Sequence, residues 1–182
     1  MPSTAPVSKA DAYPYTWVTR TQAQNLASNV NSGTKTSSLM FGVQWDLVLK
    51  YLETKGTAQA DLKTNSTNWG NYANNLWNIT NENSKYAPNG SGWTSGAYGK
   101  KDSNKSVLLS TGASETFSKQ GIYDLAGNVW KWTLEYTSNS NNPCALRGGN
   151  CNNNGDNYPA AYRGANDATY YSDVVGFRVS LF

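Results

Sequence analysis

The sequence predicts an α+β domain in which two early helices are followed by long loops and a small antiparallel sheet. Apolar residues recur at helical spacing between residues 19 and 55. Asn, Ser, Thr and Gly dominate from residue 58 to residue 106, and apolar and polar residues alternate in parts of the last third. A chain of 182 residues has the size of one domain and can bury enough surface to fold without disulfides.

Both expected helices have recognisable ends. The first covers residues 19–30, with Thr19 or Thr21 as its cap and Gly33 after its end. The second covers residues 40–55, with Ser37 or Ser38 before it and Gly56 after it. Its expected core face is the apolar stripe Phe41, Trp45, Val48, Leu49 and Leu52. Residues 1–14 are expected to be a tail or a domain edge, and residues 15–182 the domain itself.

The expected sheet belongs to the last third of the chain. Gly127 and Asn128 form a turn signal, and residues 129–136 then alternate as a strand. Residues 145–149 are a second short strand, and residues 174–182 are a closing strand. The intervening residues 58–106 are interpreted as long ordered loops with short strands, fixed in place by their interspersed Trp and Tyr side chains.

The composition excludes several classes of protein. The chain has no histidine, which removes Ser-His-Asp and Cys-His nucleophiles and His-ligated metals. Its two cysteines are too few for a structural zinc site. The net charge of +3 comes from scattered basic residues, so no nucleic-acid partner is expected. No apolar run approaches the length of a membrane span, and no signal peptide is visible at the start.

Three segments in order carry a family resemblance: GIYDLAGNVWKW, then LRGGN, then VGFRVSL next to the end of the chain. Together with the helix FGVQWDLVLKYL, they resemble the formylglycine-generating enzyme (sulfatase-modifying factor) family over residues 15–182. The resemblance implies a C-type lectin-like fold. Because one fold hosts many functions, the family's chemistry has to be tested residue by residue.

The metal ligands that the resemblance implies are missing. Members that act as oxygenases bind copper through a cysteine pair, and Asn153 and Tyr158 stand at those positions. Related enzymes bind iron through histidine, which this chain lacks. Lys131 replaces a Glu that helps to bind calcium in some members. Asn128 alone would then supply too few ligands for the ion. We therefore expect no catalytic residues, no bound metal and no cofactor, with calcium as the one possible exception.

Residues 150–173 resemble the variable region of diversity-generating retroelement proteins. In that group a C-type lectin-like domain displays hypervariable residues, encoded mostly by NNY codons, which cannot encode Lys, Glu, Gln, Met or Trp. These five types make up 29 of the 182 residues, so an even spread would place about four of them in this stretch, which holds none. The stretch instead holds six Asn, three Asp and four Tyr. From composition alone, an ordinary polar loop explains the same residues.

The expected ligand-binding residues all belong to this stretch. Tyr offers a large amphipathic contact at a small cost in entropy, and Asn and Asp offer adaptable hydrogen bonds, as in antibody paratopes. The expected set is Asn150, Cys151, Asn152, Asn153, Asn157, Tyr158, Gly164, Asn166, Asp167, Tyr170, Tyr171 and Asp173. Residues 159–162 are expected to pack against the body of the domain. Arg147, Arg163 and Arg178 are expected to tie loop carbonyls, and Gly148 and Gly149 to permit turns.

The sequence therefore predicts a non-catalytic display domain. Its expected partner is a protein or a glycan on a cell surface, and its expected setting is a phage tail (the virion) or a bacterial cell surface. Two alternatives remain open. One is a copper- or iron-dependent oxygenase of the parent family, and the other is a calcium-dependent lectin that uses Asp156, Asp167 and Asp173.

Overall fold

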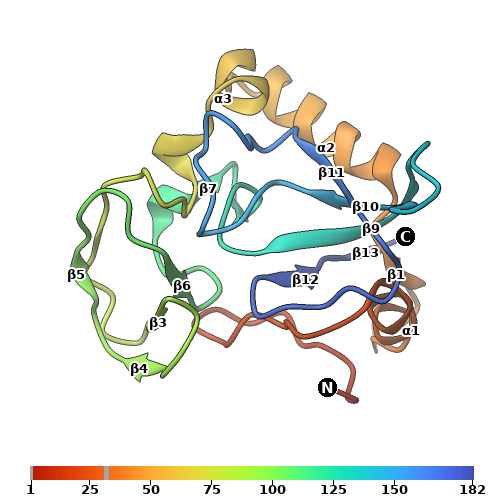
Figure 1. The fold of residues 1–182 in the computed structure, drawn as a ribbon, viewed down its shortest axis with the longest axis horizontal. Helices are drawn as coiled ribbons and strands as arrows, with labels where there is room; N and C mark the ends of the chain where they lie inside the picture. Colours follow the sequence, from red (N-terminus) through yellow and green to blue (C-terminus); the bar gives the residue numbers. More distant parts are fainter. Residues whose placement is uncertain (1, 31–32) are drawn as a thin grey trace.

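The computed structural model describes residues 2–30 and 33–182, so Met1 of the expected tail lies outside the described residues. Its main sheet has the strand order β11-β10-β9-β12. These strands are β9 (Trp130–Tyr136), β10 (Cys144–Arg147), β11 (Arg163–Asn166) and β12 (Val175–Phe177). Helix α2 (Gly42–Thr54) runs along one side of the sheet, and α1 (Arg20–Ser28) lies beyond its other side (Figure 1). The predicted α+β class is confirmed.

The first helix begins where the sequence predicts. The Thr19 hydroxyl accepts a hydrogen bond from the backbone N–H of Gln22, and the Gln22 side chain accepts one from the N–H of Thr19. This reciprocal capping box satisfies two N–H groups that a helix start leaves unpaired. Ala23, Leu26 and Ala27 then bury against the sheet, in a core cluster that includes Trp132.

The second helix departs from the prediction at its start. Ser37 and Ser38 do not cap it, because they belong to β1 (Ser37–Leu39), which pairs with β13 (Val179–Leu181). The N–H of Phe41 is instead satisfied by the side chain of Gln44. Trp45, Leu49 and Leu52 form the buried face, whereas Phe41 is exposed. The assignment of Phe41 to the core stripe is therefore wrong, because this residue precedes the first helical turn.

The middle of the chain consists mainly of ordered loops with short elements. One helix, α3 (Gln59–Lys63), was not predicted, because five residues are too few to show a helical period. The other short elements are η1 (Thr67–Trp69), β2 (Asn78–Ile79), β3 (Lys85–Pro88), β4 (Thr94–Ser95), β5 (Gly99–Lys100), β6 (Val107–Leu109), η2 (Glu115–Phe117), β7 (Ser118–Lys119) and β8 (Ile122–Tyr123). Trp77, Ile79 and Phe117 form part of a separate core cluster beneath them.

The closing strand is divided in two, which corrects the prediction of a single strand over residues 174–182. β12 runs parallel to β9, and β13 runs antiparallel to β1. Arg178 separates the two strands and directs its guanidinium toward the backbone carbonyl of Tyr123. The main sheet is consequently mixed, with antiparallel pairs β9–β10 and β10–β11 and one parallel pair.

β9 is covered on both faces. Trp132 is completely buried on the α1 side, and its indole N–H donates to the backbone carbonyl of Val18 at 3.0 Å. Lys131 and Thr133, which point the other way, are also buried. This strand therefore forms the centre of the domain, and it positions β10 and β11 beside it.

Candidate ligand-binding surface

Residues 150–173, which we call the display segment, begin after β10 and include β11 at the edge of the main sheet. β11 pairs antiparallel with β10 in a register that places Gly164 opposite Leu146 and Arg163 opposite Arg147. The turn between the strands starts at Gly148 and Gly149, whose φ angles of 83° and 72° lie in the left-handed region. The predicted turn role of these two glycines is confirmed.

The first half of the display segment is held to the domain mainly through its backbone. The N–H groups of Gly155 and Ala160 donate to the side chains of Asn74 and Ser66. The carbonyl of Asn153 accepts from the N–H of Ala73, and the Tyr72 hydroxyl lies 2.8 Å from the carbonyl oxygen of Tyr158. Because these contacts use main-chain atoms of the segment, they do not depend on which side chains it carries.

Two predicted ligand contacts are buried instead. The Asn150 side chain accepts from the N–H of Asn152 and stabilises the local turn. The Cys151 side chain packs in an apolar cluster with Ala87, Leu108 and Val129. As buried residues, Cys151 and Asn150 support the fold of the segment, and Asn150 also lines the hollow described below. This loop lacks the alternating pattern that marks a buried face, so no local signal indicated their burial.

The remaining predicted residues reach solvent. Asn152, Asn157, Tyr170 and Tyr171 are exposed. Asn153, Tyr158, Gly164, Asn166, Asp167 and Asp173 are partly exposed. We call the solvent-reaching side chains of the display segment, together with Trp130, the display surface. One polar residue of this surface, Asp167, already has a partner within the segment, because its carboxylate accepts from the N–H of Thr169. Hydrogen bonding to Thr169 also lowers the pKa of the Asp167 carboxyl group.

A hollow of about 250 Å³ lies at the centre of the display surface. Seven of its nine lining residues come from the display segment, and five of these were predicted. Its lining is Trp130, Leu146, Asn150, Tyr158, Tyr162, Gly164, Ala165, Asn166 and Tyr170. The arrangement brings aromatic rings and amide groups to one concave place, which is the usual make-up of a ligand site.

The aromatic wall of the hollow is a cluster of three rings. The ring centroids of Tyr158 and Tyr162 are 4.8 Å apart, and each lies 5.8 Å from the centroid of Trp130. Gly164 leaves the Trp130 ring open, since even a Cβ at that position would lie only 3.5 Å from the ring. Packing of edge against face fixes each ring and leaves part of it available to a ligand.

Trp130 and Tyr162 were not predicted as site residues. Trp130 precedes the display segment by 20 positions and shares a strand with the buried Trp132, a pattern that favours the core. Tyr162 belongs to the block 159–162 that was expected to pack against the body, and of this block Pro159 and Ala160 are indeed buried. The one signal that could have found Tyr162 is its residue type, because an aromatic residue in a variable-type loop is a candidate contact.

A network of ion pairs lies at the start of β11 and joins it to β9, β10 and α2. The guanidinium of Arg147, almost completely buried, pairs with Asp46 of α2, and that of Arg163 pairs with Asp46 and with Glu135 of β9. The prediction that all three arginines tie loop carbonyls is therefore confirmed for Arg178 and wrong for the other two. Since Asp46 serves both arginines, the network joins α2 to β10 and to the start of β11.

The calcium site that the resemblance implies does not fit these residues. The amino group of Lys131 donates to the backbone carbonyls of Leu125 (3.3 Å) and Gly127 (2.7 Å) and so occupies oxygens that a hard cation would need. The Asn128 side-chain oxygen already accepts from the Asn71 side chain and from the N–H of Leu109. Within residues 2–30 and 33–182, no cluster of three or more Cys, Asp or Glu could hold a metal ion.

The copper site does not fit either. Asn153 accepts from the N–H of Asn150 at 3.0 Å, and Tyr158 packs in the aromatic wall, so neither position offers a soft ligand. Cys144 and Cys151 are both buried and unpaired with each other. Burial raises the pKa of the Cys151 thiol to about 12, and burial also raises the pKa of Cys144. A thiolate, which copper requires, is thus disfavoured at both positions.

We expect both thiols to be inert in the folded protein. At pH 8 the pKa of about 12 leaves Cys151 almost entirely protonated, so a thiol-specific disulfide reagent should react with neither cysteine until the chain unfolds in denaturant. Titration with Cu(I) should give the same weak binding for the wild-type protein and for Cys151→Ser. Stoichiometric copper binding that disappears in Cys151→Ser would contradict the assignment of this residue to the core.

Comparison with known proteins identifies the family. The profile of the sulfatase-modifying factor enzyme 1-like domains matches residues 3–181, so the chain belongs to this family. This membership confirms the C-type lectin-like fold that the resemblance implies. A solved structure, Treponema denticola variable protein 1, is similar with a TM-score of 0.44 and 19% identity over 80% of this chain and 47% of that protein. The chain thus spans about half the length of that protein. No curated protein matches the chain.

Proposed function

We propose that this chain is a non-catalytic domain that binds a ligand through the display surface. The observation that carries the proposal is the division of roles within residues 150–173. Backbone groups such as the Gly155 N–H and the Asn153 carbonyl fix the segment to the domain. Side chains of Tyr158, Tyr162 and Tyr170 meanwhile line a concave surface. A display scaffold requires this division, because its fold must not depend on the side chains that it shows.

The chemistry of the display surface suits recognition of a protein or a glycan. Tyrosine rings supply contact area with few rotatable bonds, and the Asn side chains can turn their amide groups to donate or accept. The setting that we propose is a phage tail or a bacterial cell surface, where variation of such a surface changes the receptor that is bound. Among the residues that the structure describes, no helix is long and apolar enough to cross a membrane.

The experiment is a pair of matched libraries on the same chain. One library randomises Asn152, Asn157, Tyr158, Tyr170 and Tyr171 with NNY codons, and the control library randomises the exposed α2 residues Val43, Leu47, Lys50, Tyr51 and Thr54 in the same way. Both are displayed on phage and selected for binding to immobilised streptavidin. We expect folded binders from the first library and few or none from the second. Equal yields from both libraries, or unfolded products from the first, would overturn the proposal.

The DNA beside the gene offers an independent test of natural variation. A reverse-transcriptase gene and a near-identical repeat of the sequence that encodes the display segment are expected nearby, with mismatches confined to adenines of the repeat. If neither is present, the display segment is an ordinary polar loop as far as variation is concerned, although the library experiment can still show that it binds.

A further inference from the structure

A second group of exposed aromatic side chains lies beside the display surface. Two pairs form it: Tyr13 with Trp93, at 4.9 Å between ring centroids, and Trp17 with Tyr171, at 6.1 Å. These four side chains are 55%, 37%, 49% and 47% exposed respectively. Only Tyr171 belongs to the display segment, since Tyr13 and Trp17 come from the N-terminal segment and Trp93 from the β3–β4 connection. Aromatic rings that meet in pairs and remain partly exposed offer apolar faces to a ligand.

The backbone of Trp17 supports this interpretation. Its φ angle of 60° lies in the left-handed region, which bulky residues rarely adopt. The N–H of Trp17 donates to the carbonyl of Ser172 at 3.0 Å, so the turn itself is needed to join the N-terminal segment to the display segment. Glycine would make the same turn without strain. The backbone at this position therefore does not require a tryptophan.

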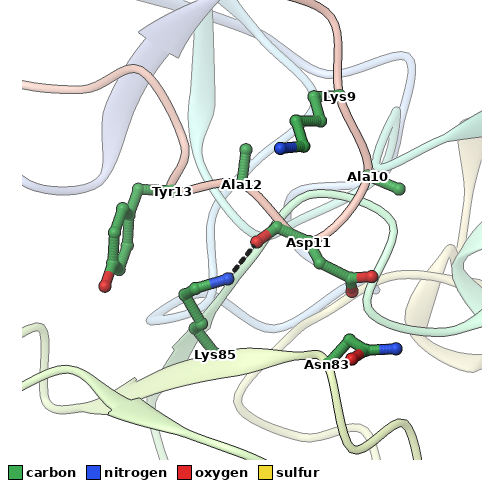
Figure 2. A pocket seen from close by; sticks show the side chains of 7 residues that line it. All are labelled: Lys9, Ala10, Asp11, Ala12, Tyr13, Asn83 and Lys85. Atoms are coloured by element: carbon green, nitrogen blue, oxygen red, sulfur yellow. Dashed lines mark hydrogen bonds between the residues drawn. The ribbon is translucent and has the colours of Figure 1, made fainter.

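A hollow of about 430 Å³ adjoins the Tyr13–Trp93 pair, and Figure 2 shows the residues that line it. Lys9 and Lys85 bring ammonium groups to it, and Asn83 brings an amide. The Lys85 ammonium donates to the backbone carbonyl of Asp11 and lies 5.5 Å from the centroid of the Tyr13 ring. The Asp11 carboxylate also lines the hollow, where it accepts from the Asn81 side chain. The hollow thus combines two cations, one carboxylate, an amide and an aromatic ring, and its cations outnumber its anions.

We propose that this hollow and the neighbouring rings, together called the N-terminal site, bind an acidic polysaccharide. The C–H faces of a pyranose ring carry partial positive charge and stack on the negative faces of aromatic rings such as Tyr13 and Trp17. Carboxylates along the polymer pair with Lys9 and Lys85, and hydroxyl groups can bond to Asn83. The site shares Tyr171 with the display surface but none of the residues that line the central hollow, so its ligand need not be the one that the display surface selects.

The experiment titrates the full chain calorimetrically with an alginate hexasaccharide, which carries one carboxylate on each sugar. Maltohexaose, a neutral oligosaccharide of the same length, and hexaglutamate, a peptide with the same number of side-chain carboxylates, are the control ligands. We expect alginate to bind, sodium chloride at about 0.5 M to weaken it, and both control ligands to bind at least about tenfold more weakly.

Variants locate the site. Trp17→Gly and Lys9→Glu are each expected to weaken alginate binding at least tenfold, whereas Tyr170→Ala in the central hollow leaves it unchanged. Lys9→Glu should unfold at the same temperature as the wild-type protein, because Lys9 is exposed, so its loss of binding would not reflect a loss of the fold. Absence of alginate binding, unchanged binding in both site variants, or equal binding of either control ligand would overturn the proposal. The library is selected for streptavidin binding and this titration measures alginate binding, so the two proposals fail separately although Tyr171 belongs to both surfaces.

Discussion

Replacing Trp132 by alanine is expected to destabilise the protein by about 3–5 kcal/mol, which is the usual cost of deleting a large buried aromatic side chain. Trp132 is completely buried between β9 and α1, and its indole N–H donates to the carbonyl of Val18. The substitution removes this packing and leaves that carbonyl without its donor. For a domain of this size, the corresponding fall in the unfolding temperature is roughly 6–20 °C.

The matched control changes the display surface. A variant with alanine at Asn152, Asn157, Tyr170 and Tyr171 alters four exposed side chains, each expected to contribute no more than about 0.5 kcal/mol. Their combined loss of about 2 kcal/mol or less remains below that of the single core change. Thermal and urea unfolding of both variants would measure the contrast. If the fourfold variant unfolds as readily as Trp132→Ala, these side chains stabilise the fold, and the display interpretation should be given up.

The parts of the fold that follow from local signals could be predicted from the sequence. The capping box at Thr19 and Gln22 places the start of α1, and the alternation after Asn128 places β9. Alternation does not show which strands pair, however. The closing stretch from 174 to 182 alternates throughout, yet it leaves β9 for β1 at Arg178, since its partner is chosen by distant parts of the chain.

The sequence predicts which segment forms the site, but it does not predict which residues of that segment are buried. A stretch without Lys, Glu, Gln, Met or Trp marked the display segment, and five of its predicted residues do line the central hollow. Cys151 is buried because β3, β6 and the chain after Asn128 converge on it, and these contacts are distant in sequence. Trp130 contributes to the hollow because Gly164, on another strand, has no side chain to cover its ring. Only the tertiary structure shows either relation.

Asn128→Ala is expected to cost about 3–6 kcal/mol, a loss as large as that of the buried tryptophan although the side chain is small and polar. Asn128 is buried, and its side chain accepts from the Asn71 amide and the Leu109 N–H and donates to the Leu109 carbonyl. Alanine would leave the N–H and the carbonyl of Leu109 unpaired in the interior, at about 1–3 kcal/mol for each typical buried group, whereas the Asn71 amide keeps its bond to the Val107 carbonyl. Asn128 also has a φ angle of 61°, a conformation that asparagine tolerates better than alanine.

Two further variants separate the two contributions. Asn128→Gly loses the same hydrogen bonds without the backbone strain, so it should be about 1–2 kcal/mol more stable than Asn128→Ala. Asn104→Ala should show the strain alone, because Asn104 has a φ angle of 60° and is exposed. Urea unfolding would give all three values.

The Asn128 carbonyl also accepts from the Cys151 N–H, so the side chain that joins the Asn71 loop to β6 lies directly beneath the start of the display segment. A loss below about 1 kcal/mol for Asn128→Ala would show that water replaces these bonds, and that the support beneath the display segment is looser than the structure indicates.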